Sequence, residues 1–274
     1  LYDVEISPEL VSKISEKIMP EVTAWQNRPL DSVYPFVFMD AIHYKVKENH
    51  QYQTKAAYVV LGITMEGRKD ILGVWIGANE SSKFWLNVLN DLKNRGVLDV
   101  YLFCVDGLTG FVEAINAVYP QSQVQRCIIH QIRSSTRYVS YKDIKALMVD
   151  LKLVYTAVTE DEALNHLAAF SEKWSKHYPS CVRSWENNWE ILSTFFAYPP
   201  EIRRIIYTTN IIEGLNRQFR QITKNKPSFT SDDSLRKMLY LASKKIMTHW
   251  TARCRNWDMV LAQLNVMFEG RHTA

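Results

Sequence analysis

The stretch DGLTGFVEAINAVYPQSQVQRCIIH, Asp106–His130, decides the fold of this chain. It follows the apolar run Tyr101–Val105, which predicts a buried strand that stops at Asp106. Gly107 and Gly110 then allow the backbone to turn away from the carboxylate. The stretch therefore begins with an acidic residue at the end of a strand.

A helix and a second extended segment complete the stretch. The apolar residues after the turn recur at the spacing of an amphipathic helix: they are Phe111, Ala114, Ile115 and Val118. Pro120 ends this helix. Val124–Ile129 then predict an extended or buried segment that returns Cys127 and His130 towards the edge where the first strand stopped.

A second acidic strand end lies upstream. Residues 33–39 form a mostly apolar run consistent with a central strand, and the run ends at Asp40. Residues 42–46 alternate between apolar and polar side chains, as in an outer strand, and a turn is expected at 48–50. If the strands before Asp40 and Asp106 are parallel neighbours, both carboxylates emerge at one sheet edge, where open α/β sheets bind ligands.

The segment between the two acids supplies a hairpin and a helix. Strands are predicted at Ala57–Thr64 and Ile71–Ile76, on either side of a turn at 65–68. Ser81 or Ser82 caps a helix that ends at Gly96. Its sheet-facing residues are Trp85, Val88, Leu89 and Leu92. Three meandering strands, a helix, a strand, a helix and a fifth strand predict an α/β fold with a mixed five-stranded sheet flanked by helices.

The pattern changes to helices alone from Ser134 to Arg204. Helices are predicted at Tyr141–Val158, Asp161–His177 and Val182–Phe195, which indicates an all-α insertion after the fifth strand. The chain then divides into an N-terminal helix and linker (1–32), a first part of the core (33–133), the insertion (134–204), and a second part of the core with C-terminal helices (205–274).

Composition favours an intracellular enzyme of ordinary size. The chain has 274 residues, 47% of them hydrophobic, and a formal charge of +4, which alone does not establish nucleic-acid binding. Its four cysteines contain no Cys-x-x-Cys pair, and no signal peptide or membrane span is recognised, so a reducing cytoplasm is expected. Residue 1 is Leu, and we expect the chain to be a fragment of a longer protein.

Cationic residues concentrate in one region. Between residues 203 and 226 a single acid, Glu213, is accompanied by six cations: Arg203, Arg204, Arg217, Arg220, Lys224 and Lys226. Such a face is either simply solvated or suited to contact with a phosphate backbone. The insertion adds Trp185 and Trp189, each of which is either a packing residue or a platform for an exposed DNA base.

The acids suggest a site for divalent metal ions. Two or three converging carboxylates can hold divalent metal ions, which prefer hard oxygen ligands. Either Asp40 or Asp106 alone can also be a strand-end residue bonded to a turn. Glu213 has two interpretations: it forms a capping box with Asn210, or it faces the site from a helix whose opposite stripe is apolar.

The opening stretch resembles the signature of the Mutator-type transposases, including the related bacterial insertion-sequence enzymes. The residues that match this signature in identity and spacing are Asp106, Gly110, Phe111, Pro120, Gln125, Cys127 and His130. Further segments are similar to their catalytic region: FVFMDAIHYKV (36–46), KFWLNVLNDLKNRG (83–96), AYPPEIRRIIYTTNIIEGLN (197–216) and the terminal NWDMVLAQLNVMFEGR. The likeness covers nearly the whole chain. Ile211 and Gly214 stand where relatives often have Ala and Ser.

The resemblance implies a ribonuclease H-like fold and a DDE-type transposase. By this resemblance, the expected metal ligands are Asp40, Asp106 and Glu213, which would hold Mg²⁺ or Mn²⁺. Its expected partners are double-stranded DNA, as terminal inverted repeats and target, and a second subunit in a homodimer. The expected location is the bacterial cytoplasm, in association with the nucleoid.

Three alternatives remain open at this point. Cys127 and His130 have the spacing of half a zinc site, but the other half is absent, so we favour a neutral His130 that orients water or contacts the scissile phosphate. The chain can also be a transposase-derived DNA-binding protein without activity. A ribonuclease H-like nuclease or junction resolvase would share the same metal chemistry.

Overall fold

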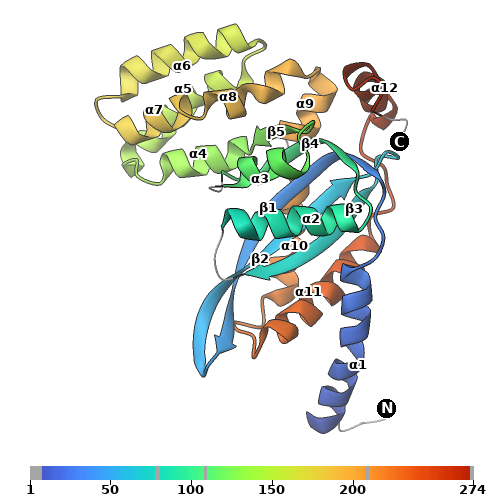
Figure 1. Ribbon diagram of the computed structural model, residues 1–274. Coiled ribbons are helices and arrows are strands. Elements are labelled where there is room, and N and C mark those ends of the chain that lie inside the picture. The colour runs from blue at the N-terminus through green and yellow to red at the C-terminus, as the bar shows by residue number, and fades with distance from the viewer. Residues whose placement is uncertain (1–7, 78–80, 108–109, 208–209, 272–274) are drawn as a thin grey trace.

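A mixed five-stranded sheet forms the centre of the molecule (Figure 1). The computed structural model describes residues 8–77, 81–107, 110–207 and 210–271, with the side chains of 17–206 and 211–271 within those ranges. The strands are β1 (Val33–Glu48), β2 (Gln51–Ile63), β3 (Lys69–Gly77), β4 (Asp99–Val105) and β5 (Gln123–Arg126). Their order is β3-β2-β1-β4-β5. β2 is antiparallel to β1 and β3, whereas β4 is parallel to β1 and β5.

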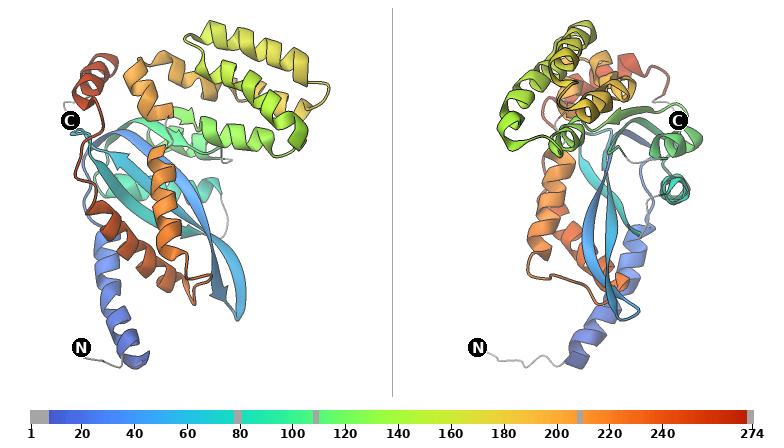
Figure 2. Two further views of the ribbon diagram at one scale, coloured as in Figure 1. Left: turned by 180° about the vertical axis from the view of Figure 1, so that it is seen from behind. Right: turned by 90° about the vertical axis from the view of Figure 1, so that its left-hand side faces the viewer.

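Helices cover both faces of this sheet, as the sequence predicted (Figure 2). α2 (Ser82–Asn94) and α3 (Phe111–Val118) pack on one face, and α10 (Asn210–Thr223) and α11 (Asp232–Met247) pack on the other. β1 is buried between the two layers. Phe36 and Phe38 belong to the core on the α10 side, whereas Val37 and Met39 belong to the core on the α2 side. Burial on both faces explains why this strand is a continuous apolar run.

The two short helices beside the sheet follow their sequence signals. Ser81 caps α2 by accepting a hydrogen bond from the backbone N–H of Phe84, and the four predicted sheet-facing residues of α2 are buried. Gly110 precedes α3 with a φ of +77°, a backbone conformation that favours glycine. The four predicted apolar residues of α3 are buried as well.

One predicted strand end is wrong. β1 does not stop at Asp40 but continues to Glu48, and it pairs with β2 across a tight turn at Asn49 and His50, both of which have positive φ. What ends near Asp40 is the pairing with β4, whose last partner in β1 is Met39. The alternation of residues 42–46 therefore marks the half-exposed extension of the same strand.

The helical block begins earlier than the sequence indicated. Residues 128–130 lie in a helix rather than in an extended segment, because Cys127 caps α4 with its Sγ atom and ends the short strand β5. The block contains α4 (Ile128–Thr136), α5 (Tyr141–Thr156), α6 (Glu160–Trp174), α7 (Pro179–Glu186), α8 (Trp189–Leu192), a 3₁₀ helix (Ser193–Ala197) and α9 (Pro200–Tyr207). The predicted third helix is thus divided into three short pieces.

The helical block is not a separate globule. A continuous cluster of buried side chains runs from Phe38 in the sheet to Leu151 and Trp185 in the block. The side chain of Gln125 in β5 also donates a hydrogen bond to the carbonyl of Leu192. These contacts fix the block above the end of the sheet at which β4 and β5 stop (Figure 1).

Two further helices pack at the periphery. α1 (Pro8–Gln26) contacts α11 and β3, with Trp25 lying against Tyr240, and α12 (Trp257–Met267) packs against α9. The predicted N-terminal helix is thus present, and residues 1–7 lie outside the described residues. In the described part of the chain, no helix has the length and apolar character needed to cross a membrane.

Trp185 is a core residue, which corrects one of the two candidate base-stacking positions. It is 1% exposed, and its indole N–H donates to the Ser135 hydroxyl, so no face of the ring is accessible to a DNA base. Trp189 is only partly buried, and its indole N–H donates to Glu160 at 3.1 Å. Trp174, which the sequence also placed in this block, is 7% exposed and donates to Asp150.

We expect Trp185→Ala to lower the free energy of unfolding by ~3–5 kcal/mol, because it removes a fully buried aromatic side chain. Urea unfolding followed by circular dichroism measures this loss, with Trp189→Ala as the partly buried control. A loss below about 1 kcal/mol would show that the ring contributes little to the core.

Candidate active site

The register between β1 and β4 brings Asp40 and Asp106 together. The two strands run in parallel with Met39 opposite Val105, and an aspartate follows each of these residues: Asp40 within β1 and Asp106 directly after β4. The sequence prediction that both carboxylates meet at one sheet edge is confirmed in this respect. Asp40 is 8% exposed, whereas Asp106 is half-buried.

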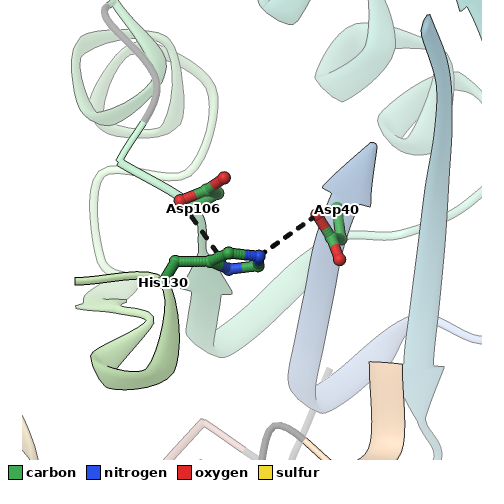
Figure 3. A group of neighbouring side chains, drawn as sticks. All are labelled: Asp40, Asp106 and His130. Atoms are coloured by element: carbon green, nitrogen blue, oxygen red, sulfur yellow. Dashed lines mark ion pairs between the residues drawn. The ribbon is translucent and has the colours of Figure 1, made fainter. Parts of the chain in front are cut away.

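His130 completes a compact group with the two aspartates (Figure 3). Its Nε2 lies 4.0 Å from Oδ1 of Asp40, and its Nδ1 lies 3.7 Å from Oδ1 of Asp106. One ligand atom from each of the three residues lies within 4.8 Å of the other two. The buried Nδ1 of His130 has no hydrogen-bond partner in the described residues. Two carboxylates and an imidazole with an unsatisfied nitrogen are a donor set that suits a divalent cation.

Asp40 is held in place from two directions. The backbone N–H of Ala41 donates to its Oδ1 at 2.8 Å, and the side-chain amide of Asn216 donates to its Oδ2. Burial raises the pKa of the Asp40 carboxyl above its usual value, and the neighbouring His130 opposes that rise. Asn216 is 1% exposed and lies on α10. The sequence analysis did not identify it, because its contact with Asp40 joins residues far apart in the chain.

Glu213 lies at the same place but outside the compact group. It lines a cavity of about 160 Å³ together with Asp40 and His130. Its Oε1 forms an ion pair of 2.8 Å with Arg133 of α4, whose side chain is 60% exposed. The apolar stripe of α10 is buried against the core, and Glu213 lines the cavity from another side of the same helix. The side chain of Asn210, on which the capping alternative depends, lies outside the described residues.

The predicted cations divide into two groups. Arg217 and Arg220 are exposed and line the same cavity as Glu213. Farther along, Lys224 is exposed and Lys226 lies over the ring of Phe229.

Arg203 and Arg204 belong to α9 rather than to this face. The guanidinium of Arg203 donates to the carbonyls of Val158, Phe196 and Tyr198, so Arg203 holds the helical block together and the prediction that it contacts DNA is not supported. Arg204 is exposed beside a different cavity, near Arg253 and Arg255.

Cys127 is not placed as a metal ligand. Its buried Sγ accepts a hydrogen bond from the backbone N–H of His130, and burial raises the pKa of the thiol to about 12. It stands outside the group that Asp40, Asp106 and His130 form. The preference for a buried cysteine over half a zinc site therefore agrees with the structure, although Cys127 is a helix cap and not a strand residue.

Arg126 was also missed by sequence reasoning. Its guanidinium lies next to Gly107, where any larger side chain would collide with it, and it donates to the side-chain oxygen of Asn188. Burial lowers the pKa of the Arg126 guanidinium, and the negative charge of Asp106 opposes that change. Arg126 therefore lies close to the backbone just after β4, and a larger residue at 107 would require its guanidinium to shift.

Comparisons with known proteins agree with this geometry. The family model described as "Transposase, Mutator family" matches residues 1–253. The transposase for insertion sequence element ISRM3 of Rhizobium meliloti (strain 1021) is 43% identical over 99% of this chain and 68% of its own length. A probable insertion-sequence transposase of Corynebacterium diphtheriae is 43% identical over 87% of this chain and 70% of its own length.

Among solved structures, the Drosophila P element transposase strand transfer complex aligns with 97% of this chain and 80% of that chain, at 12% identity and a TM-score of 0.34. A structural similarity at this level is too distant to support a conclusion about fold or function. The family model and the two bacterial relatives show that this chain belongs to the Mutator family of transposases.

Proposed function

We propose that this chain is the catalytic part of a DDE-type transposase, which cleaves DNA at transposon ends and joins the ends to target DNA with Mg²⁺ or Mn²⁺. The observation that carries the proposal is the group of Asp40, Asp106 and His130 at the point where the parallel pairing of β1 and β4 ends. The order of strands and helices supports a ribonuclease H-like core, in which carboxylates at this edge serve phosphodiester chemistry.

The residues at the sheet edge fit a divalent cation. Asp40 and Asp106 would hold it through carboxylate oxygens, with Glu213 as the third acid. A bound cation of this kind makes a water or sugar hydroxyl nucleophilic and stabilises the leaving oxygen of the phosphodiester. The side-chain amide of Asn216 donates to Oδ2 of Asp40 and so orients the carboxylate. Oδ1 makes no bond to Asn216.

Glu213 needs a rearrangement before it joins the two aspartates. Its carboxylate is now paired with the guanidinium of Arg133, which is mostly exposed. A DNA phosphate is a bidentate acceptor for the same guanidinium and competes with Glu213 for it. We propose that DNA binding draws Arg133 away and allows Glu213 to turn towards Asp40 and Asp106.

His130 has a role beside the acids. Its ring lies between the two aspartates, and one of its nitrogens has no hydrogen-bond partner in the described residues (Figure 3). A neutral imidazole in this position can orient a water molecule or donate a hydrogen bond to the scissile phosphate.

The partners follow from the chemistry and the charges. Arg217, Arg220, Lys224 and Lys226 supply phosphate contacts for double-stranded DNA, both terminal repeats and target. Trp189 stays a candidate for stacking on an unpaired base. We propose a homodimer, because joining two transposon ends takes two such sites, and a place on the nucleoid in the cytoplasm.

A strand-transfer assay on duplexes that carry the element's ends is the direct test of this function. We expect cleavage and joining with Mg²⁺ and neither in excess EDTA. DNA binding without cleavage at any metal concentration would favour the alternative of an inactive, transposase-derived DNA-binding protein. Metal-dependent cleavage of branched or hybrid duplexes without joining would favour a ribonuclease H-like nuclease or resolvase.

We expect Asp40→Asn, Asp106→Asn and Glu213→Gln each to lower cleavage by at least about 10³-fold, because each removes a ligand charge with little change of shape. Thermal midpoints should stay equal or rise, since repulsion among the acids is relieved. Glu190→Gln, at an exposed acid of α8, is the matched control. Activity near that of the wild type in one of the three variants would remove that residue from the site.

We expect Asn216→Ala to act through Asp40. The variant should need about tenfold more Mg²⁺ for half-maximal cleavage, because Asp40 loses the donor that orients it, while the rate at saturating Mg²⁺ falls less. A metal titration of the cleavage rate measures both quantities. An unchanged metal requirement together with a lower thermal midpoint would limit Asn216 to a structural role.

A further inference from the structure

The hairpin formed by the second half of β1 and the first half of β2 projects beyond the rest of the sheet. β4 pairs with β1 only as far as Met39, whereas β1 and β2 stay paired to Glu48 and Gln51. The hairpin thus begins at Asp40 and leads away from the candidate active site, on the side opposite the helical block (Figures 1 and 2).

The inner face of this hairpin is anchored. Ile42, Tyr44 and Val46 are buried, and Tyr44 meets the ring of Phe229 edge-on. The backbone N–H of Lys47 donates to the carbonyl of Phe229, and that of Phe229 donates to the carbonyl of Lys45, both at 2.8 Å. The hairpin is therefore a braced arm and not a loose loop.

The acids near the arm are neutralised on that same inner face. Lys55 is 6% exposed and forms ion pairs with Glu48 at 3.2 Å and with Asp232 at 2.9 Å. The outer face of the hairpin carries the side chains that alternate with the buried ones along each strand, and none of them is a carboxylate. Its exposed members are His43, Lys45, Lys47, Tyr52 and Thr54. Across the described part of the chain, no ion pair is made by Lys45 or Lys47.

Packing does not explain this outer face. The exposed side chains of Lys45 and Lys47 lie on the face of β1 opposite to the one that packs on the loop at Phe229, so the packing of the hairpin does not require cations there. They stand two residues apart along an extended strand, roughly 6.7 Å from one another, and continue from Ala41, which lines the cavity of the active site. On the neighbouring helix α10, Arg217, Arg220 and Lys224 follow Glu213 away from the same cavity. Because α10 packs on the inner face of β1, its cations and the lysines of the outer face leave the site on opposite faces of the hairpin.

We propose that the outer face of the β1–β2 hairpin is a second DNA-binding surface, which holds the phosphate backbone of the duplex through Lys45 and Lys47. The inference rests on the proposed function, since it takes DNA to be the substrate. Charge complementarity is the reason for choosing DNA as the occupant: the surface is cationic, lacks acids and continues from the site of phosphodiester chemistry.

With the duplex taken to run along the hairpin, the length of the strand sets where on the DNA this contact falls. Lys45 and Lys47 lie five and seven residues beyond Asp40, which is about 17–23 Å along an extended strand. At ~3.4 Å per base pair, the arm meets phosphates roughly 5–7 base pairs from the cleaved bond, on one side of it only.

The test is DNA binding by the whole chain, measured by fluorescence anisotropy over a range of salt concentrations. We expect the double variant Lys45→Ala/Lys47→Ala to bind duplex DNA more weakly, with a slope of log K against log salt that is smaller in magnitude by about 2. Lys45→Arg/Lys47→Arg should keep the wild-type slope. The thermal midpoint should not change, because both side chains are exposed. A double Ala variant with the wild-type slope would overturn the proposal.

Two controls make the test specific to position. Lys244→Ala/Lys245→Ala removes the same charge from exposed residues at the end of α11 and should leave the slope unchanged. An equal loss in that control would mean that only net charge matters, and the proposal would fail. With duplexes shortened step by step on either side of the cleavage point, the defect of the hairpin variant should vanish below about 5 base pairs on one side. A defect at every length on both sides contradicts the proposed contact.

The outcome for the hairpin is independent of catalysis. Binding is measured without metal, and the same comparison can be repeated in the Asp40→Asn background. A slope difference without any Mg²⁺-dependent cleavage would support the arm and reject the proposed activity. Mg²⁺-dependent cleavage without a slope difference would support the proposed activity and reject the DNA contact of the hairpin.

Discussion

The parallel pairing of β1 with β4 is the constraint on which the site depends. One register places Met39 opposite Val105, and only in that register are Asp40 and Asp106 next to each other. The register is fixed by side chains on both faces, since Phe38 and Met39 of β1 belong to different cores. A slip by one residue would exchange these two faces, so the packing of the whole sheet holds the two carboxylates together.

Other elements are built around that pair. β5 is short because Cys127 caps the next helix, and α4 then brings His130 to the aspartates and Arg133 to Glu213. From the other side, α10 buries its apolar stripe and presents Asn216 to Asp40. The site is therefore the meeting point of the sheet, the helical block and the second part of the core. Burial in this setting raises the pKa of Asp40, a pattern typical of functional sites.

Much of this was predictable from local pattern. Apolar runs located the strands, and helical spacing identified the buried faces of α2 and α3. The acids after β4 and within β1 were found because they interrupt apolar runs. Strand continuity beyond Asp40 was missed, because alternation with polar residues resembles a new outer strand when the partner loop at Phe229 is unknown. Asn216 and Arg133 were not predictable, since their partners lie far away in the sequence and neither residue type marks such a role. Trp185 was ambiguous in sequence, and its burial and its bond to Ser135 decide the question.

The central claim is that Asp40 and Asp106 together hold a divalent cation. The most direct measurement is the anomalous scattering of manganese in crystals of this chain grown with Mn²⁺. The account predicts a manganese peak between the two carboxylates, coordinated by an oxygen of each and lost in the Asp40→Asn variant. A peak bound to only one of the two aspartates, or none at this edge of the sheet at saturating Mn²⁺, would contradict it.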